Sequence, residues 1–183
     1  MKELVKYLYE IGQLKRVQRS GWWIAGIKHP ETVAEHSFRT AVIAYILAHL
    51  EGADPDKSLA MSLFHDTAEA RVNDIHAVAR RYINWQNVEQ KTINEQVTRL
   101  PAEVADKISR LFAELEELST IEAKVVHDAD ALECLIQARE YQSQGFANVG
   151  DWIRNCQNVL ITTSGKNIAQ ACLGTEPSEW WAI

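Results

Sequence analysis

The sequence predicts an all-α fold. Apolar residues recur at spacings of three and four along most of the chain, which is the periodicity of a helix that buries one face. Only 8 glycines and 4 prolines occur in 183 residues, which favours long helices over many short strands. No segment reads convincingly as a strand, and no internal repeat or low-complexity tract is visible. We therefore expect residues 1–183 to form a single domain, a helical bundle with one core.

Two helices are expected before residue 53. An apolar stripe with helical spacing predicts the first helix over residues 2–13. Residues 14–30 contain two glycines and a proline, so an irregular connection is expected there. The second helix is predicted to start at Glu31 or Thr32 and to end at Gly52, a residue type suited to a helix C-cap.

A third helix should begin near residue 55. Asp54 can cap its first turn, and Pro55 suits the first helical position. Residues 72–83 are less regular, and the remaining chain shows helical patterns again. The expected later helices cover 84–100, Pro101–Leu118, a long segment that starts at Ser119 or Thr120, and two shorter segments around 149–162 and 165–173.

Composition excludes several classes of protein. With 19 basic and 25 acidic residues the net charge is −6, which argues against general binding to nucleic-acid polymers. No run approaches the roughly 18 apolar residues that a membrane helix requires, and the N-terminus does not read as a signal peptide. The three cysteines lack a C-x-x-C spacing, which is typical of reduced thiols. We therefore expect a soluble cytoplasmic protein with no membrane partner.

Ionisable residues interrupt the apolar pattern of the third helix, which contains the stretch MSLFHDTAE. His65 and Asp66 are adjacent, and Glu69 follows within reach of both on one helix face. Asp74 lies near the expected helix end. Such groups are rarely buried unless they are paired, hydrogen-bonded or bound to a metal. A satisfied polar network and half of a metal site both fit this stretch.

Two further positions favour a metal site. His36 lies near the start of the apolar second helix, and Asp130 lies within the apolar segment VVHDADALECLI. Two histidines and two aspartates on three apolar helices are explained together by one shared divalent cation, and these donors suit Mn, Fe, Co, Ni or Zn. Helical phase alone does not separate Asp128 from Asp130 as the last ligand.

The order His36, His65–Asp66, Asp130 resembles the H…HD…D signature of the HD-domain superfamily of metal-dependent phosphohydrolases. The resemblance covers nearly the whole chain. The branch that holds bacterial 5′-deoxynucleotidases and their eukaryotic HD-domain relatives is similar in four segments, which are LKRVQRSGW, ETVAEHS, LFHDTAEARVNDI and DADALECLIQAREY.

This resemblance implies an HD-domain helical bundle with one divalent transition-metal ion bound between helices. It favours Asp130 over Asp128 as the fourth ligand. It also implies functional positions at Glu69 and Asp74, as candidates for proton transfer and for support of the ligands. The expected reaction is hydrolysis of (deoxy)nucleoside 5′-monophosphates to nucleoside and phosphate, carried out by a homodimer.

The loop before the second helix is the expected substrate-binding element. No acidic residue occurs between Glu10 and Glu31, and Arg19 in this stretch is the candidate phosphate ligand, because a guanidinium can donate two hydrogen bonds to phosphate oxygens. The bacterial nucleotidases have a tryptophan directly after the matching arginine, where this chain has Ser20. Trp22 is the candidate to take over its stacking role, with Trp23 as the alternative.

Three other functions remain open. A nucleoside polyphosphate or alarmone hydrolase of the same superfamily would need more basic groups, for which Arg80 and Arg81 are the only hint. A non-catalytic binding module would keep the metal as a structural element, and would not require both Glu69 and Asp74. A metal-free polar network would need no cation at all.

Overall fold

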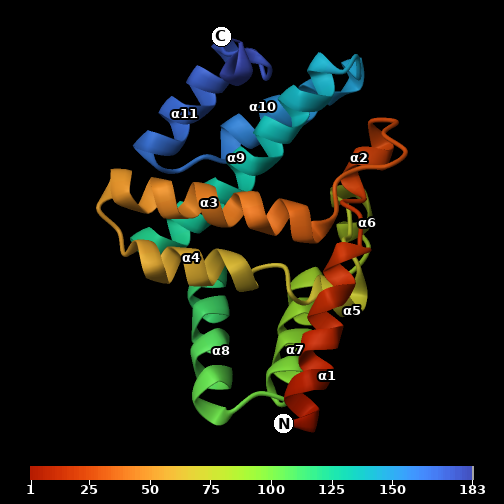
Figure 1. Cartoon of the computed structure of the whole chain (residues 1–183), viewed down its shortest axis with the longest axis vertical. Coiled ribbons are helices and arrows are strands. Elements are labelled where there is room, and N and C mark those ends of the chain that lie inside the picture. The colour runs from red at the N-terminus through yellow and green to blue at the C-terminus, as the bar shows by residue number, and fades with distance from the viewer. Residues whose placement is uncertain (183) are drawn as a thin grey trace.

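The computed structural model describes residues 1–182, and its regular structure is helical, as the sequence predicted. Within these residues the only β-type pairing is an isolated bridge between Gln18 and Thr32. Figure 1 shows the helices, which are α1 (Lys2–Ile11), α2 (Gly21–Ile24), α3 (Val33–Glu51), α4 (Pro55–Phe64), α5 (Glu69–Val72), α6 (Ala77–Arg80), α7 (Trp85–Val97), α8 (Ala102–Glu117), α9 (Ile121–Ser143), α10 (Gly150–Val159) and α11 (Thr163–Gly174).

Helix α3 begins and ends where its capping residues predict. Thr32 and Glu35 form a capping box, in which the Thr32 hydroxyl accepts from the Glu35 amide at 3.2 Å and the Glu35 carboxylate accepts from the Thr32 amide at 2.6 Å. Gly52 ends the helix with φ +71°, a left-handed conformation that glycine adopts without strain. These caps fix the rotation of α3, and with it the direction of His36.

Helix α4 ends earlier than the sequence suggests. Asp54 caps its start by accepting from two backbone amides at 3.0 Å, but the helix stops at Phe64. His65 and Asp66 therefore lie in a turn between α4 and α5, and the expectation of one continuous helix is wrong. Side-chain bonds favour the turn, because His65 Nδ1 donates to the Ser62 carbonyl at 2.6 Å and the Thr67 hydroxyl donates to the Phe64 carbonyl at 2.9 Å.

The main core lies where α3 and α4 pack on α9, which runs behind them in Figure 1. α1, α7 and α8 extend from one side of this layer, whereas α10 and α11 lie on the other side. The largest side chains that are fully buried at its centre are Leu47, Met61, Leu132 and Leu135. Polar groups on α3 and α9 are therefore held by a close-packed apolar framework, which keeps their geometry rigid.

None of the helices among residues 1–182 is long and apolar enough to cross a membrane. The three cysteines, Cys134, Cys156 and Cys172, are all free thiols. Cys156 is buried and the other two are half-buried, as expected for reduced cysteines that pack in a core.

Candidate metal centre

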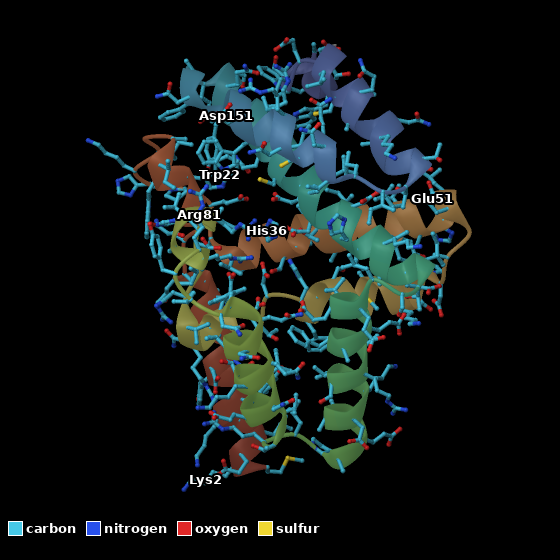
Figure 2. The ribbon with its side chains drawn as sticks, turned by 180° about the vertical axis from the view of Figure 1, so that it is seen from behind. Lys2, Trp22, His36, Glu51, Arg81 and Asp151 are labelled. Carbon is cyan, nitrogen blue, oxygen red and sulfur yellow. The ribbon has the colours of Figure 1, made fainter. Side chains whose placement is uncertain are left out.

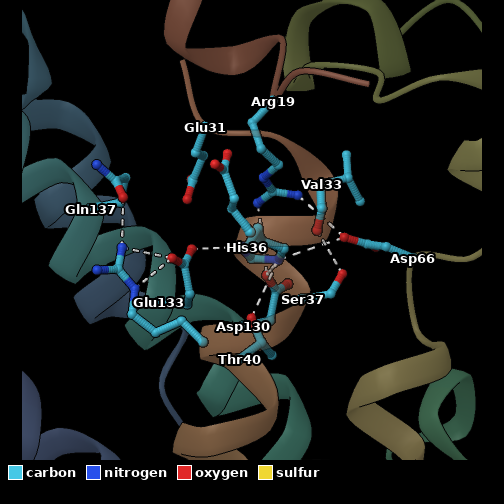
Figure 3. Close-up of polar contacts among 12 residues, drawn as sticks. Arg19, Glu31, Val33, His36, Ser37, Thr40, Asp66, Asp130, Glu133 and Gln137 are labelled. Atoms are coloured by element: carbon cyan, nitrogen blue, oxygen red, sulfur yellow. Dashed lines mark hydrogen bonds and ion pairs between the residues drawn. The ribbon is translucent and has the colours of Figure 1, made fainter. Parts of the chain in front are cut away.

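The two histidines and two aspartates singled out in the sequence meet at one point of the fold. His36 comes from the first third of α3, His65 and Asp66 from the turn after α4, and Asp130 from the middle of α9. His36 Nε2 lies 3.1 Å from Asp130 Oδ1 and 3.6 Å from Asp66 Oδ2 (Figure 3). His65 Nε2 lies 3.2 Å from Asp66 Oδ2. The three elements thus direct nitrogen and oxygen donors into one small space.

The free atoms of this cluster fit a divalent cation. Each imidazole uses Nδ1 for a hydrogen bond, to Ser62 from His65 and to Glu133 from His36, which leaves Nε2 of both rings facing the carboxylates. His65 Nε2 is buried and makes no hydrogen bond to any described residue. Donor atoms of His36, His65 and Asp66 lie within 4.8 Å of one another. Such a set of imidazole nitrogens and carboxylate oxygens is typical of a transition-metal site.

A buried ion pair supports His36 from behind. Glu133 is fully buried, and its Oε2 accepts from His36 Nδ1 at 2.5 Å. Its other oxygen accepts from Arg39 Nε at 2.8 Å, and Arg39 also donates to Gln137 and Glu140. This arrangement fixes the tautomer and orientation of the imidazole, as carboxylates behind metal-bound histidines do.

The structure separates the two aspartates that helical phase left open. Asp128 accepts from the Ile161 amide at 2.9 Å, and from the amide and hydroxyl of Thr162 at 2.7 Å each. Its oxygens are therefore occupied by the segment that leads into α11. Asp130 instead lines the cavity beside His36. Of the two, only Asp130 has oxygens directed at the histidine cluster.

Arg19 is part of the same cluster. Its guanidinium lies 3.4 Å from Asp66, 3.7 Å from Asp74 and 3.8 Å from Asp130, and its side chain is 18% exposed. Asp74 also accepts from the Ser20 amide at 2.5 Å, so it anchors the loop that carries Arg19. The arginine is therefore held at the cluster and does not extend into solvent.

The charges of the cluster favour ionised aspartates. Burial opposes ionisation, but His65 and Arg19 hold the pKa of Asp66 well below its usual range, and His36 and Arg19 do the same for Asp130. Burial also opposes a charged imidazole, yet hydrogen bonds to Asp130 and Glu133 raise the pKa of His36 to about 10. A cation that binds at Nε2 must therefore displace a proton from His36.

The pKa of Glu69 is raised, whereas the pKa values of Asp66 and Asp130 are lowered. Glu69 is fully buried in α5, and neither carboxyl oxygen makes a hydrogen bond within the part of the chain that the structure describes. Burial, with Asp66 and Asp74 nearby, raises the pKa of Glu69 to about 10. Arg80 Nη2 approaches one oxygen at 3.8 Å. In the metal-free protein the neutral form of the Glu69 carboxyl group is therefore favoured.

A cavity of about 470 Å³ opens beside these groups. This volume lies in the range of pockets that hold small ligands. The predicted site residues that line it are Arg19, Trp22, His65, Asp66, Asp74 and Asp130.

Trp22 lines the cavity, and other aromatic side chains pack on its ring. Figure 2 labels Trp22, which belongs to α2. Its indole is 2% exposed, stacks on Trp152 of α10 at 5.8 Å and meets the ring of Tyr141 edge-on at 5.1 Å. Its Nε1 donates to Glu31 at 3.0 Å. The ring therefore presents little free surface.

No role was assigned from the sequence to Glu133 or Glu89, and Arg80 was only a hint of a polyphosphate substrate. Glu133 could have been recognised by its spacing of one helical turn from Asp130 on the same apolar helix. Arg80 lines the cavity, and its guanidinium lies 5.0 Å from the centre of the Trp85 ring. Glu89 also lines it, from α7. Nothing in the polar pattern of α7 distinguishes Glu89 from its neighbours.

Known proteins are similar to this chain in sequence and in fold. The family model described as HD domain matches residues 11–170. The human 5′-deoxynucleotidase HDDC2 is 32% identical over 142 residues, which cover 77% of this chain and 69% of that protein. The 5′-deoxynucleotidase hdd1 of Schizosaccharomyces pombe is 31% identical over 144 residues, covering 76% and 72%. A conserved hypothetical protein from Pyrococcus furiosus superposes with a TM-score of 0.80 at 29% identity, covering 93% and 99%.

Proposed function

We propose, because the chain belongs to the HD domain family, that it is a metal-dependent phosphomonoesterase that hydrolyses (deoxy)nucleoside 5′-monophosphates to nucleoside and phosphate. The observation that carries this proposal is the meeting of His36, His65, Asp66 and Asp130 beside a cavity that Arg19 also lines. Relatives named 5′-deoxynucleotidase support the choice of substrate.

The four residues of the cluster would hold one divalent cation, through the Nε2 atoms of His36 and His65 and through the carboxylates of Asp66 and Asp130. Their mixture of nitrogen and oxygen donors supports a transition metal, which we take to be Mn, Co, Fe, Ni or Zn. When bound, such a cation supplies Lewis-acid polarisation of the phosphoryl group and an activated water.

The chain's own residues would do the rest of the chemistry. Arg19 binds phosphate oxygens through its guanidinium, in exchange for part of its contact with the aspartates. In the reaction the bond from phosphorus to the 5′ oxygen breaks, and a bond from phosphorus to the water oxygen forms. The leaving 5′ oxygen must gain a proton. Glu69, whose buried carboxyl group beside the cluster makes no hydrogen bond to the described residues, is the group we assign to hold or move it.

Two further residues would position these groups. Asp74 holds the Arg19 loop through the Ser20 amide, and its carboxylate is the alternative group for proton transfer. Glu133 keeps His36 in the tautomer whose Nε2 is free. Trp22 would form the part of the substrate-binding wall next to Arg19.

A nucleoside polyphosphate is the second candidate substrate, because Arg80 lines the same cavity as Arg19. Arg80 is held by a hydrogen bond from Nε to the Ile75 carbonyl at 2.7 Å. Its neighbour Arg81 does not line the cavity, so the chain offers one extra guanidinium for a second phosphate group.

We further propose that the protein acts as a homodimer in the cytoplasm, with residues 1–183 as one domain, on a small-molecule nucleotide and not on a nucleic-acid polymer or at a membrane. The exposed apolar side chains of α3 support a contact between two copies, and they are Phe38, Val42, Tyr45, Ile46 and Leu50. Sedimentation equilibrium tests this, because a dimer that α3 forms should dissociate when Phe38 is changed to Ser. A monomeric wild-type protein would contradict it.

Phosphate release from a panel of nucleotides tests the activity. The protein is stripped with chelator, reloaded separately with Mn²⁺, Co²⁺, Zn²⁺ or Mg²⁺, and assayed with deoxy- and ribonucleoside 5′-monophosphates and the matching triphosphates. Metal-dependent release of phosphate from monophosphates is the expected result. Release from triphosphates alone would favour the second candidate, and stoichiometric metal binding without any release would favour a binding module.

A further inference from the structure

One part of the cavity wall differs from the part that carries the candidate metal ligands. Helices α7, α8 and α9 form it, and α7 and α8 lie next to each other in Figure 1. Its apolar side chains are Phe112, Leu115, Leu118 and Val126. Three ionisable side chains line the cavity among them, and these are Glu89, Glu116 and His127. The wall is thus mainly apolar with a few polar groups, which is the usual composition of a site for a small organic ligand.

Glu89 is the polar side chain of this wall whose carboxyl group has the most oxygen lone pairs left for a ligand. The side chain is half-buried, and burial raises the pKa of its carboxyl to about 7, although Arg80 and the Trp85 side chain lower it. Among the described residues no cation forms an ion pair with Glu89, and Arg80 instead approaches Glu69 at 3.8 Å. The neighbouring Glu116 already accepts from Gln86 Nε2 at 3.0 Å. His127 is hydrogen-bonded to Asp128 at 3.1 Å.

The chemistry of this wall matches a nucleobase. A base has flat apolar faces and one polar edge that carries both hydrogen-bond donors and acceptors. Apolar side chains can cover the faces, and a carboxyl group can accept from an amino or imino group and, when protonated, also donate to a ring nitrogen. The other aromatic part of the cavity, at Trp22, offers little free surface because Trp152 and Tyr141 already pack on that ring.

We propose that the wall formed by α7, α8 and α9 is the nucleobase subsite and that Glu89 hydrogen-bonds the polar edge of the base. Glu89 is then a specificity-determining residue, contributed by a helix that holds none of the candidate metal ligands. This inference rests on the proposed function, since it assumes that the phosphate of a nucleotide lies at Arg19.

Comparison of a substrate that has a base with one that lacks it tests the subsite. We would measure kcat/KM for deoxynucleoside 5′-monophosphates and for 2-deoxyribose 5-phosphate, which keeps the sugar and phosphate. Glu89→Ala should lower kcat/KM for the nucleotides about tenfold, the effect of losing a hydrogen bond to a partly charged group, and should leave the sugar phosphate within about twofold. Glu89→Gln keeps the size of the side chain and offers both a hydrogen-bond acceptor and donors, so it should retain most of the activity.

Two other variants complete the design. Leu115→Trp fills the apolar wall, so it should also reduce activity on nucleotides and spare the sugar phosphate. Glu95→Ala removes a carboxylate from the same helix, where Glu95 pairs with Arg71 at the surface, and should change neither substrate. An equal loss on both substrates in Glu89→Ala and Leu115→Trp, or no loss in either variant, would overturn the subsite.

Failure of the proposed function would be seen separately. If the metal-loaded wild-type protein releases phosphate from neither substrate, that reaction is wrong, and calorimetry with unreactive deoxynucleosides then decides on the subsite alone. Binding that weakens about tenfold in Glu89→Ala and persists in Glu95→Ala would support it. Absence of binding to the wild type would overturn it.

Discussion

A histidine is followed directly by an aspartate at two places in the chain, His65–Asp66 and His127–Asp128, and the two pairs have different surroundings. At His65–Asp66, the carboxylate faces cations and imidazoles, with Arg19 at 3.4 Å and His65 Nε2 at 3.2 Å. At His127–Asp128, the carboxylate accepts from two backbone amides and a hydroxyl of residues 161–162. The first pair has atoms left for a ligand, whereas the second stabilises a helix start. The dipeptide alone therefore does not determine the role, and the segment that faces the carboxylate does.

The largest contrast should come from substitutions at the two pairs. Changing both His65 and Asp66 to Ala removes two of the four donors, so we expect loss of the bound metal and a fall in phosphate release of at least about a thousandfold. His127→Ala is the matched control, and it should keep full metal content. Elemental analysis of the purified proteins, with circular dichroism to verify folding, measures this. Full metal occupancy in the double variant would contradict the assignment.

Loss of the charged hydrogen bond between Glu133 and His36 should have a smaller effect on metal binding. Glu133→Gln loses the charge that orients the imidazole, and we expect the affinity for the metal to fall about 10- to 100-fold. Glu140→Gln is the control, because it loses a bond to Arg39 at 2.7 Å but none to His36. Competition with a fluorescent chelator gives both affinities. Equal affinities in the two variants would show that Glu133 has no such role.

Substitutions at the two aspartates of α9 should have different effects, on stability at Asp128 and on metal binding at Asp130. Asp128→Asn leaves buried amides poorly satisfied, so it should lower the free energy of unfolding by about 1–3 kcal/mol, or the Tm by about 2–4 °C per kcal/mol, with the metal retained. Asp130→Asn should instead lose the metal, while the bonds from Asp128 to residues 161 and 162 stay intact. Scanning calorimetry with and without chelator checks this. Loss of metal in Asp128→Asn alone would reverse our choice of ligand.

The metal-free and metal-loaded proteins should also differ in the pH dependence of their stability. In the metal-free protein Asp130 and Glu133 raise the pKa of His36 from its ordinary 6.5 to about 10. The stability that this protonation contributes is fully present below pH 6.5 and is lost as the pH rises through about 10.

The metal-loaded protein should not show this loss between pH 8 and pH 10, because a metal-bound His36 carries no proton in the folded state and the unfolded chain is already neutral at this residue above its ordinary pKa of 6.5. Urea unfolding at pH 6, 8 and 10, with chelator or with metal, compares the two forms. Parallel pH profiles for the two forms would contradict a cation at His36 Nε2.

Much of the fold follows from local signals in the sequence. Thr32 and Glu35 cap α3, and Asp54 with Pro55 starts α4, where the chain alone predicts these features. The end of α4 could not be predicted, because no glycine or proline marks it. Hydrogen bonds from the side chains of His65 and Thr67 to the carbonyls of the last turn favour the turn that follows.

The site was predictable in its ligand types and less so in its surroundings. Asp128 and Asp130 lie about 200° apart around α9, but α9 is buried on most of its circumference, so periodicity cannot tell which side faces the cavity. The roles of Glu133, Arg80 and Glu89 depend on helices that are distant in sequence. Only their packing brings these three residues to the site.

The most direct test of the metal centre is an anomalous difference map from crystals of the Mn²⁺-loaded protein, with data collected above the manganese edge. Our account predicts a peak within roughly 2.0–2.3 Å of His36 Nε2, His65 Nε2 and the carboxylates of Asp66 and Asp130. A map with no peak among these four residues, or with its peak at His127 and Asp128 instead, would contradict it.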